Sequence, residues 1–211
     1  MTSLDLEGVT VCPIGAPALF RPVTISVASG SVTTIMGPSG IGKSTLIDFV
    51  GGHLSAEFEA EGRVRLNGRD VTRLPAEARR IGILFQDAFL FPHLSVGDNL
   101  AFGLSSDIRA RAERRARVEA ALEQAGLADF ADRDPATLSG GQRARVALMR
   151  TLLAEPRALL LDEPFSKLDP DRRADLREFV FRHVRDRGLP VLMVSHDADD
   201  AAAAGGPVVS L

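Results

Sequence analysis

The chain has 211 residues, a formal net charge of −3 at pH 7, one cysteine, 11 phenylalanines and neither tryptophan nor tyrosine. No apolar run reaches the roughly 18 residues that a membrane helix needs, and the acidic N-terminal stretch lacks a signal-peptide core. The single cysteine, Cys12, forms no internal disulfide, which fits a reducing compartment. The near-zero charge argues against general nucleic-acid binding, so we expect no nucleic-acid partner.

The first part of the chain is predicted to consist mainly of strands. Short apolar or alternating runs predict strands over residues 4–11, 22–28, 31–36, 62–66 and 81–85. A helix is predicted over residues 43–50, directly after a loop at 38–42 that breaks the pattern.

The middle of the chain is predicted to be helical and the last part mixed. Helices are expected at 95–104, 107–125 and 141–154, with no convincing strand between them. Apolar runs at 158–161 and 191–195 predict buried strands, a helix is expected between them at 171–187, and residues 207–211 form a last edge strand. This order predicts a parallel-centred α/β core with a helical subdomain set into it.

A phosphate-binding loop is the most specific local signal. Residues 37–44, Gly-Pro-Ser-Gly-Ile-Gly-Lys-Ser, fit the pattern G-x-x-x-x-G-K-[ST] between a predicted strand and a predicted helix. Glycines let backbone amides turn around phosphate oxygens, and the following helix directs its positive end at the same anion. Lys43 can then reach the β- and γ-phosphates, and the Ser44 hydroxyl can bind Mg²⁺. The stretch therefore predicts a site for a nucleoside triphosphate.

Two adjacent acids end the apolar run at 158–161. Ligands of open α/β sheets sit beyond the carboxyl ends of the strands. Asp162 is predicted to hold the Mg²⁺ shell, and Glu163 to face the γ-phosphate and an attacking water. Alone, the pair is equally well a strand running into a solvated acidic turn; beside the phosphate loop, it favours catalysis.

A second helix start with anion-binding character lies at residues 138–142, Leu-Ser-Gly-Gly-Gln. The Ser139 side chain and the amides of Gly140 and Gly141 can bind an anion there. A second phosphate-binding helix start is explained if it serves a nucleotide held by another copy of the chain. The alternative is a plain helix N-cap with flexible glycines.

Together the motifs resemble the ATP-binding cassette (ABC) ATPases. In the family's order they are the Walker A loop at 37–44, the Q-loop at 83–87, the signature at 138–142, Walker B at 159–163, the D-loop at 166–169 and the switch at 194–197. The resemblance implies ATP hydrolysis and a P-loop NTPase fold of the ABC type. That fold has a mixed, parallel-centred sheet with flanking helices, an antiparallel β N-terminal part and an inserted α-helical subdomain. We expect a single domain over 1–211, with the core at 1–87 and 155–211 and the helical subdomain at approximately 88–154.

The resemblance also implies a role for each matching residue. The catalytic residues are Lys43, Gln86, Glu163 as general base and His196 as γ-phosphate switch. Mg²⁺ is held by Ser44, by Gln86 and, through water, by Asp162. The bound ATP contacts Gly37, Ser39, Gly40, Gly42, Lys43, Ser44 and Thr45. In a head-to-tail homodimer that sandwiches two ATP, the partner's nucleotide contacts Ser139, Gly140, Gly141 and Gln142, and Asp169 contacts the partner's phosphate loop. Without the other motifs, Gln86 would be a polar strand terminus.

The stretch at 86–100 resembles the importer branch of the family. The runs 81–88 and 134–150 are similar to the YnjD-type ATPases of bacterial importers. The resemblance implies a peripheral position on the cytoplasmic face of the cell membrane, permease subunits docking near Phe89–Leu94 through Phe89, Leu90, Phe91 and Leu94, and a solute-binding protein. The alternative for these side chains is the core of the helical subdomain itself. Alternative functions are a DNA-associated ABC ATPase, for which the stretch from Gln86 to Ser139 is too short, and a nucleotide-gated assembly module.

Three features depart from the family or stay open. The adenine-stacking aromatic that the family places before Walker A falls on Ile14, with Phe20 as the alternative after a register shift, so we predict weak base selection. An arginine-rich stretch at 109–117 is either a contact surface for lipid or a partner, or a solvated helix face with i,i+4 ion pairs. Only 15 residues follow His196, so no C-terminal regulatory domain is expected.

Overall fold

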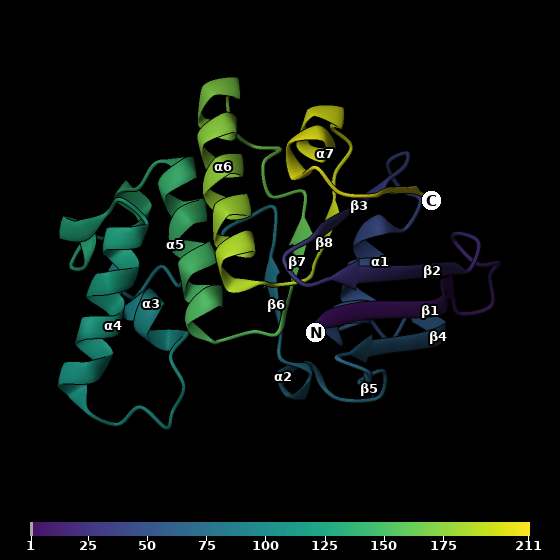
Figure 1. Cartoon of the computed structure of the whole chain (residues 1–211), viewed down its shortest axis with the longest axis horizontal. Coiled ribbons are helices and arrows are strands. Elements are labelled where there is room, and N and C mark those ends of the chain that lie inside the picture. The colour runs from purple at the N-terminus through teal and green to yellow at the C-terminus, as the bar shows by residue number, and fades with distance from the viewer. Residues whose placement is uncertain (1) are drawn as a thin grey trace. The chain divides into compact units, whose positions relative to one another are not determined.

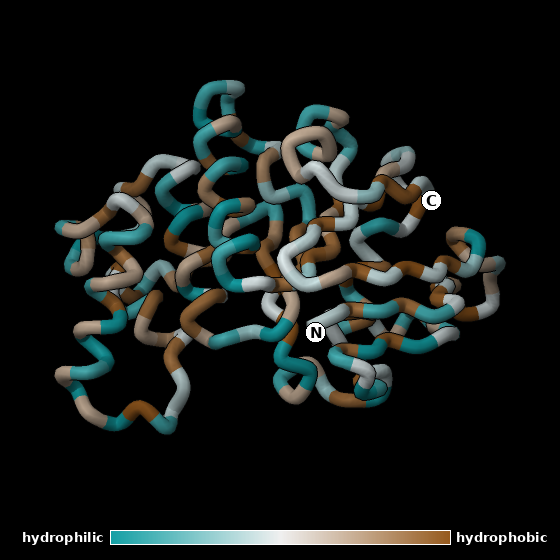
Figure 2. Tube along the Cα trace, in the orientation of Figure 1, coloured by the Kyte–Doolittle hydropathy of each residue, from teal (hydrophilic) through white to brown (hydrophobic). Residues whose placement is uncertain are grey.

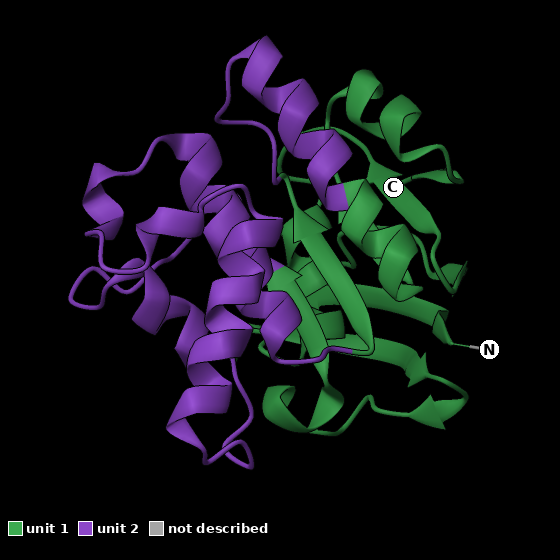
Figure 3. Cartoon of the chain, turned by 60° about the vertical axis from the view of Figure 1, so that its left-hand side comes forward, with its two compact units in different colours: residues 1–83, 157–163, 181–211 green, residues 84–156, 164–180 purple. Residues whose placement is uncertain are grey.

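The computed structural model describes residues 2–211 and divides into two compact units (Figure 3). Unit 1 consists of Met1–Ile83, Arg157–Glu163 and Phe181–Leu211, and unit 2 of Leu84–Pro156 and Pro164–Val180. The domain limits expected from the sequence stay a prediction.

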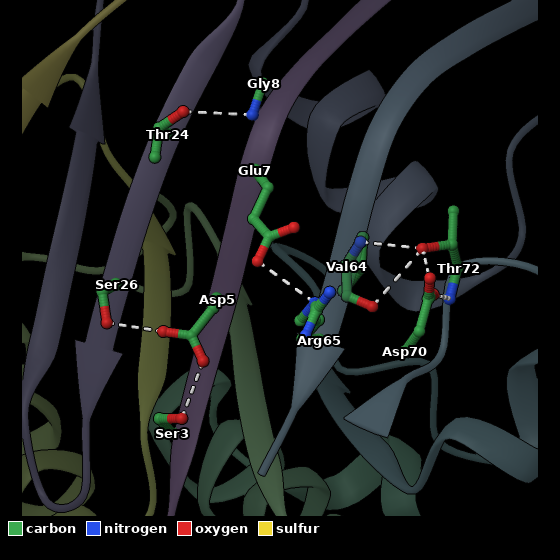
Figure 4. Close-up of polar contacts among 10 residues, drawn as sticks. All are labelled: Ser3, Asp5, Glu7, Gly8, Thr24, Ser26, Val64, Arg65, Asp70 and Thr72. Atoms are coloured by element: carbon green, nitrogen blue, oxygen red, sulfur yellow. Dashed lines mark hydrogen bonds and ion pairs between the residues drawn. The ribbon is translucent and has the colours of Figure 1, made fainter. Parts of the chain in front are cut away.

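An antiparallel sheet forms the first layer of unit 1, in the order β2-β1-β4-β5 (Figure 1). Its strands are β1 (Ser3–Pro13), β2 (Val23–Ala28), β4 (Phe58–Leu66) and β5 (Arg69–Asp70). Side chains alternate between core and surface, as expected where one face of a sheet is buried. The surface side carries cross-strand polar pairs, including the ion pair between Arg65 Nε and Glu7 Oε1 at 3.1 Å (Figure 4).

A second sheet contains the strands that deliver the functional loops. Its order is β6-β7-β8-β3-β9, formed by β6 (Ile81–Leu84), β7 (Ala158–Asp162), β8 (Val191–Val194), β3 (Val32–Met36) and β9 (Val208–Ser210). The pairs β7–β8, β8–β3 and β3–β9 are parallel. Nearly continuous apolar sequence is typical of buried parallel strands. Because these strands are parallel, the segments that follow β3, β7 and β8 emerge at one edge of the sheet, where ligands of α/β proteins bind.

The core of unit 1 joins the antiparallel sheet to helix α1 (Lys43–Gly51) and the parallel strands. Leu46, Ile47 and Val50 of α1 pack into one buried cluster with Leu160 of β7 and Val194 of β8. The apolar strands are visible as brown segments in Figure 2. Full burial of one such side chain contributes about 1.5–3 kcal/mol, so this cluster fixes α1 at the end of β3.

A buried arginine closes the other end of α1. Arg79, the last residue of helix α2 (Ala76–Arg79), donates hydrogen bonds to the carbonyl oxygens of Phe49 at 2.7 Å and Val50 at 2.9 Å. It also donates to the carbonyls of Leu74 at 2.8 Å and Thr72 at 2.6 Å. The last carbonyls of a helix have no partner within the helix, so Arg79 ties the end of α1 to the chain after β5.

Unit 2 is built from helices α3 (Val96–Phe102), α4 (Arg111–Gln124) and α5 (Gly140–Leu153), with short 3₁₀ turns at Ala128–Phe130 and Pro135–Thr137. Helix α3 contacts both α4 and α5. Residues 85–157, all of which the structure describes, contain no strand, as predicted. On α4 the ion pairs Arg115–Glu119 and Arg117–Glu113 are both of the i,i+4 type, as the solvated-face alternative for the arginine-rich stretch predicts.

Helix α6 (Pro170–Arg187) begins in unit 2 and ends in unit 1, and α7 (Ala198–Ala204) of unit 1 is followed by β9. Helix α7 has seven residues, and the alanines at 201–204 form its C-terminal end. It begins at Asp197, whose side chain accepts a hydrogen bond from the amide of Asp199 at 2.8 Å, a capping contact that stabilises a short helix. None of the helices that residues 2–211 form combines the length and the apolar character needed to cross a membrane.

Candidate active site

The loop between β3 and α1 is folded around the ammonium group of Lys43. Lys43 Nζ donates to the carbonyl oxygens of Gly37 at 2.9 Å and Pro38 at 3.0 Å, and the residue is buried. Gly42 has φ of 99°, and a Cβ there would lie 2.7 Å from Leu19 Cδ1, so only glycine fits. The predicted loop is therefore formed, with a fixed cation at the start of a helix.

An open cavity of about 410 Å³ adjoins this loop within unit 1. Its polar lining combines loop and helix residues with one carboxylate, and consists of Ser39, Gly40, Gly42, Lys43, Ser44, Thr45 and Glu163. Its apolar lining consists of Pro13, Leu19 and Phe58. The volume suits a drug-sized or nucleotide-sized ligand. Loop, helix start and Glu163 thus face one space, as the motifs predicted.

Two side-chain oxygens, one from helix α1 and one from the end of strand β7, lie close together beside the loop. Ser44 Oγ donates a hydrogen bond to Asp162 Oδ1 at 3.1 Å, joining α1 to the end of β7. Burial raises the pKa of Asp162 above its ordinary value, and the nearby carboxylates of Glu163 and Asp48 raise it further, against the lowering effect of Ser44 and Lys43. A hydroxyl and a carboxylate are oxygen ligands of the kind that Mg²⁺ prefers. A buried carboxylate whose ionised form is disfavoured gains most from a cation, so these residues fit the metal.

Glu163 and His196 form a pair at the ends of β7 and β8. His196 Nδ1 lies 3.2 Å from Glu163 Oε2. The backbone of Glu163 is left-handed, with φ of 46°, while its amide donates to the carbonyl of Val194 at 3.0 Å. A non-glycine residue in this region is strained by about 1–2 kcal/mol. The turn that bears the carboxylate is therefore held in an unusual conformation next to the loop.

A buried contact that sequence reasoning missed supports the switch segment. Ser195 Oγ donates to Asp200 Oδ2 at 2.7 Å, and both residues are buried. The amide of Asp197 donates to Ser195 Oγ at 3.1 Å. The first bond ties Ser195 to α7, and the second ties Asp197 to Ser195. The only signal in the sequence was the i,i+5 spacing of a serine and an acid, which is too common to be informative.

Unit 2 brings the Q-loop, the signature helix and the D-loop together around a smaller cavity of about 100 Å³. Gln86 Nε2 donates to Ser166 Oγ at 3.0 Å, and Lys167 Nζ donates to Asp87 Oδ1 at 2.6 Å. Gly140, at the start of α5, lines the same cavity. Two side-chain contacts therefore hold the Q-loop to the D-loop, and neither contact was predicted from the sequence.

The signature segment forms a complete capping box. Gln142 N donates to Ser139 Oγ at 3.3 Å, and Ser139 N donates to Gln142 Oε1 at 2.9 Å. The plain N-cap alternative thus describes the geometry of the chain alone. Asp169 plays a similar local part at the start of α6, where its Oδ1 accepts from the amide of Arg172 at 3.1 Å. The contacts of these residues with a partner's nucleotide stay a prediction.

The residues considered for adenine lie in two environments. Ile14 is 62% exposed and is not among the residues that line the 410 Å³ cavity. Phe20 is buried in the core of unit 1, where its carbonyl accepts from Thr10 Oγ1 at 2.7 Å. The adenine contact at Ile14 stays a prediction, and the ring of Phe20 serves the core.

Comparison with known proteins decides the family. The family profile described as ABC transporter matches residues 20–166. The chain belongs to the ABC transporter family. It is an ATP-binding subunit with ATPase activity coupled to transport, and its mixed α/β fold is the one that the resemblance implied.

Relatives within the family agree with the predicted resemblance. The uncharacterized ABC transporter ATP-binding protein YnjD of Escherichia coli K12 is 50% identical over 185 residues, which cover 88% of this chain and 85% of YnjD. The sulfate/thiosulfate import ATP-binding protein CysA of Nocardia farcinica is 45% identical over 184 residues, covering 87% of this chain and 55% of CysA. The Fe(3+) ions import ATP-binding protein FbpC of Agrobacterium fabrum is 40% identical over 196 residues, covering 92% and 54%. The chain thus spans about half the length of these two import proteins.

Proposed function

We propose that this chain is the ATP-hydrolysing subunit of a bacterial importer of a small solute, in which two copies sandwich two MgATP and drive a separate membrane permease. The observation that carries the proposal is the cavity within unit 1 that is lined by both the phosphate loop and Glu163. The printed names of CysA and FbpC as import proteins support the importer part. A solute-binding protein completes such a system, and the ATPase then works at the cytoplasmic face of the membrane.

The hydrolysis step follows from the positions of four side chains. The loop amides and Lys43 bind the phosphates, which holds the γ-phosphorus in line for attack. Glu163 accepts a proton from the attacking water as the bond from the γ-phosphorus to the ADP oxygen breaks. His196 Nδ1, 3.2 Å from Glu163 Oε2, orients that carboxylate. Ser44 and Asp162 would hold Mg²⁺, which when bound neutralises developing charge on the phosphates.

Permease docking is proposed at the docking segment, which we define as Phe89–Leu94 of unit 2. Phe89 is 63% exposed, and its carbonyl accepts a hydrogen bond from Arg150 Nη1 at 2.9 Å. The buried amide of Asn99 donates to the carbonyls of Phe91 at 3.1 Å and Leu94 at 3.2 Å. An exposed phenylalanine on a rigidly held loop is the kind of anchor that protein interfaces use.

Replacing Glu163 tests the catalytic assignment. We expect Glu163→Gln to lower the steady-state ATPase rate by about 10²- to 10⁴-fold, the usual contribution of a general base, while MgATP binding persists. The rate is measured by phosphate release, and binding by calorimetry. Glu119→Gln, which removes an exposed acid of α4 from its pair with Arg115, is the matched control and should retain full activity. Equal rates for Glu163→Gln and wild type would remove the general-base role.

A further inference from the structure

The apolar side of the nucleotide cavity is formed by residues that no motif of the sequence marks. Pro13 is the last residue of β1, Leu19 follows in the loop after it, and Phe58 is the first residue of β4. All three line the same cavity as Lys43 and Ser44. We call Pro13, Leu19 and Phe58 the apolar wall.

An extension of the pairing between β1 and β4 places Phe58 in this wall. The register of the two strands shifts between Glu7 and Thr10, and pairing then continues to the ends of both strands, where Pro13 lies opposite Phe58. One more bond follows, from the amide of Ile14 to the carbonyl of Glu57 at 3.0 Å. The first residue of β4 is therefore fixed beside the last residue of β1.

A glycine makes this extension possible. Gly62 has φ of 94°, and a Cβ there would lie 2.6 Å from the carbonyl oxygen of Gly8. The two strands approach too closely at this point for any side chain. A register shift with such a contact is a specific feature of the backbone, and its effect is to carry Phe58 to the cavity.

Phe58 is held on one side and accessible on the other. Its side chain is partly buried and packs against the hydrophobic core of unit 1, as does that of Leu19. The same side chains line the cavity. Anchored aromatic and aliphatic side chains of this kind provide a preformed surface for a flat apolar ligand face.

We propose that the apolar wall, with Phe58 as its aromatic member, binds the base of the nucleotide whose phosphates occupy the loop. The proposal rests on the proposed function, because it places the remaining part of the same ATP molecule. Phosphate groups are bound by Lys43 and the loop, so a purine attached to them has an apolar surface available within the same cavity. Ile14 lies outside this lining, and we therefore assign the base contact to Phe58 in its place.

The chemistry of the wall predicts weak discrimination between bases. Proline, leucine and phenylalanine side chains carry no hydrogen-bond donor or acceptor, so they contact the faces of a base and cannot read its edge. Strong rejection of a related ligand requires polar groups that pair with the correct one. Adenine and guanine nucleotides should therefore bind with similar affinity.

Binding of three ligands distinguishes the contribution of the apolar wall from that of the phosphate loop. The ligands are MgATP, MgGTP and inorganic tripolyphosphate with Mg²⁺. We expect Phe58→Ala to weaken MgATP binding to the full chain by about 10- to 100-fold, the range for loss of stacking on one base, and to leave tripolyphosphate binding within about twofold. Phe58→Tyr should restore ATP binding. Ile14→Ala tests the competing position, and we expect it to lose less affinity for ATP than Phe58→Ala does. Val208→Ala, at an exposed apolar position outside the cavity lining, is the matched control and should bind ATP like wild type. Affinities are measured by calorimetry, with circular dichroism to confirm folding.

Each outcome decides between the two proposals. If Phe58→Ala binds ATP like wild type, or if Ile14→Ala loses as much affinity, the base is not bound by the wall. A preference of wild type for ATP over GTP above a hundredfold would also overturn the proposal. If wild type binds neither ATP nor tripolyphosphate, the proposed function fails instead. Should Phe58→Ala not fold, Phe58→Leu keeps the apolar packing without an aromatic face, and ATP affinity equal to wild type in that variant would contradict a stacking role.

Discussion

At the scale of single residues, folding shifts the pKa values of two aspartates of unit 1 in opposite directions. Burial raises the pKa of Asp162, whereas hydrogen bonds from Thr72 lower the pKa of Asp70 (Figure 4). A raised pKa means that the favourable contribution of Asp162 exists at acid pH and is lost as the pH rises through that pKa. A lowered pKa means that the contribution of Asp70 exists above its ordinary value of 3.8 and is lost as the pH falls.

The two aspartates therefore predict opposite effects of the same substitution at neutral pH. Without nucleotide or Mg²⁺ at pH 7, we expect Asp162→Asn to raise Tm by a few degrees, because the amide still accepts from Ser44 and carries no buried charge. Asp70→Asn should lower Tm, and both differences should shrink toward pH 3. Thermal unfolding in chelator over this pH range checks the signs. A lower Tm for Asp162→Asn at pH 7 would contradict the assigned cause of the pKa shift.

Single residues also show what the sequence can and cannot predict about the site. Lys43, Ser44, Asp162 and Glu163 were predictable because a short spacing or a strand end determines their chemistry locally. Phe58 was not, because it reaches the cavity only through a register shift and pairing with a strand 45 positions away, from Pro13 to Phe58. No local pattern encodes such a contact.

At the scale of elements, the docking segment is held by α3 and α5 of unit 2. Asn99 of α3 and Arg150 of α5 bind its backbone carbonyls, which leaves the ring of Phe89 exposed. A charged side chain in place of Phe89 should therefore weaken the contact with a partner without changing the fold of the docking segment.

We expect Phe89→Asp to abolish co-purification of the chain with the proposed permease subunits, because the energy of an interface concentrates in a few buried anchors. The ATPase rate of the isolated chain should stay within about twofold. Val208→Asp, at a similarly exposed apolar position of β9, is the control and should co-purify normally. Recovery of the complex with Phe89→Asp at wild-type yield would exclude Phe89 as an anchor.

Most elements were predictable, and the exceptions have a common cause. The strands and long helices follow from apolar runs and from the loop and capping residues at their ends. Helix α2 and strand β5 were missed because they are four and two residues long and are stabilised by distant partners such as the carbonyls that Arg79 binds. Elements of this length have no periodicity to detect.

At the scale of the whole molecule, the proposed sandwich requires a second copy to complete each site. We expect Glu163→Gln to elute as a dimer with MgATP and as a monomer without it, since slowed hydrolysis traps the closed form. Size-exclusion chromatography with light scattering measures the shift. Lys43→Ala in the same background removes a phosphate contact and should stay monomeric with MgATP. A Glu163→Gln variant that never dimerises would contradict the sandwich.

The order of strands in the parallel sheet has a consequence for how the protein is made. Strand β3, which leads into the phosphate loop, lies between β8 and β9, and Val32 pairs with Val191. During synthesis β3 leaves the ribosome long before β8 and β9 have been translated. Its backbone groups therefore have no strand to pair with until all of unit 2 has been translated. The ability to bind nucleotide should therefore appear abruptly and late in translation. Nascent chains released before β8 should depend on chaperones that cover exposed strands.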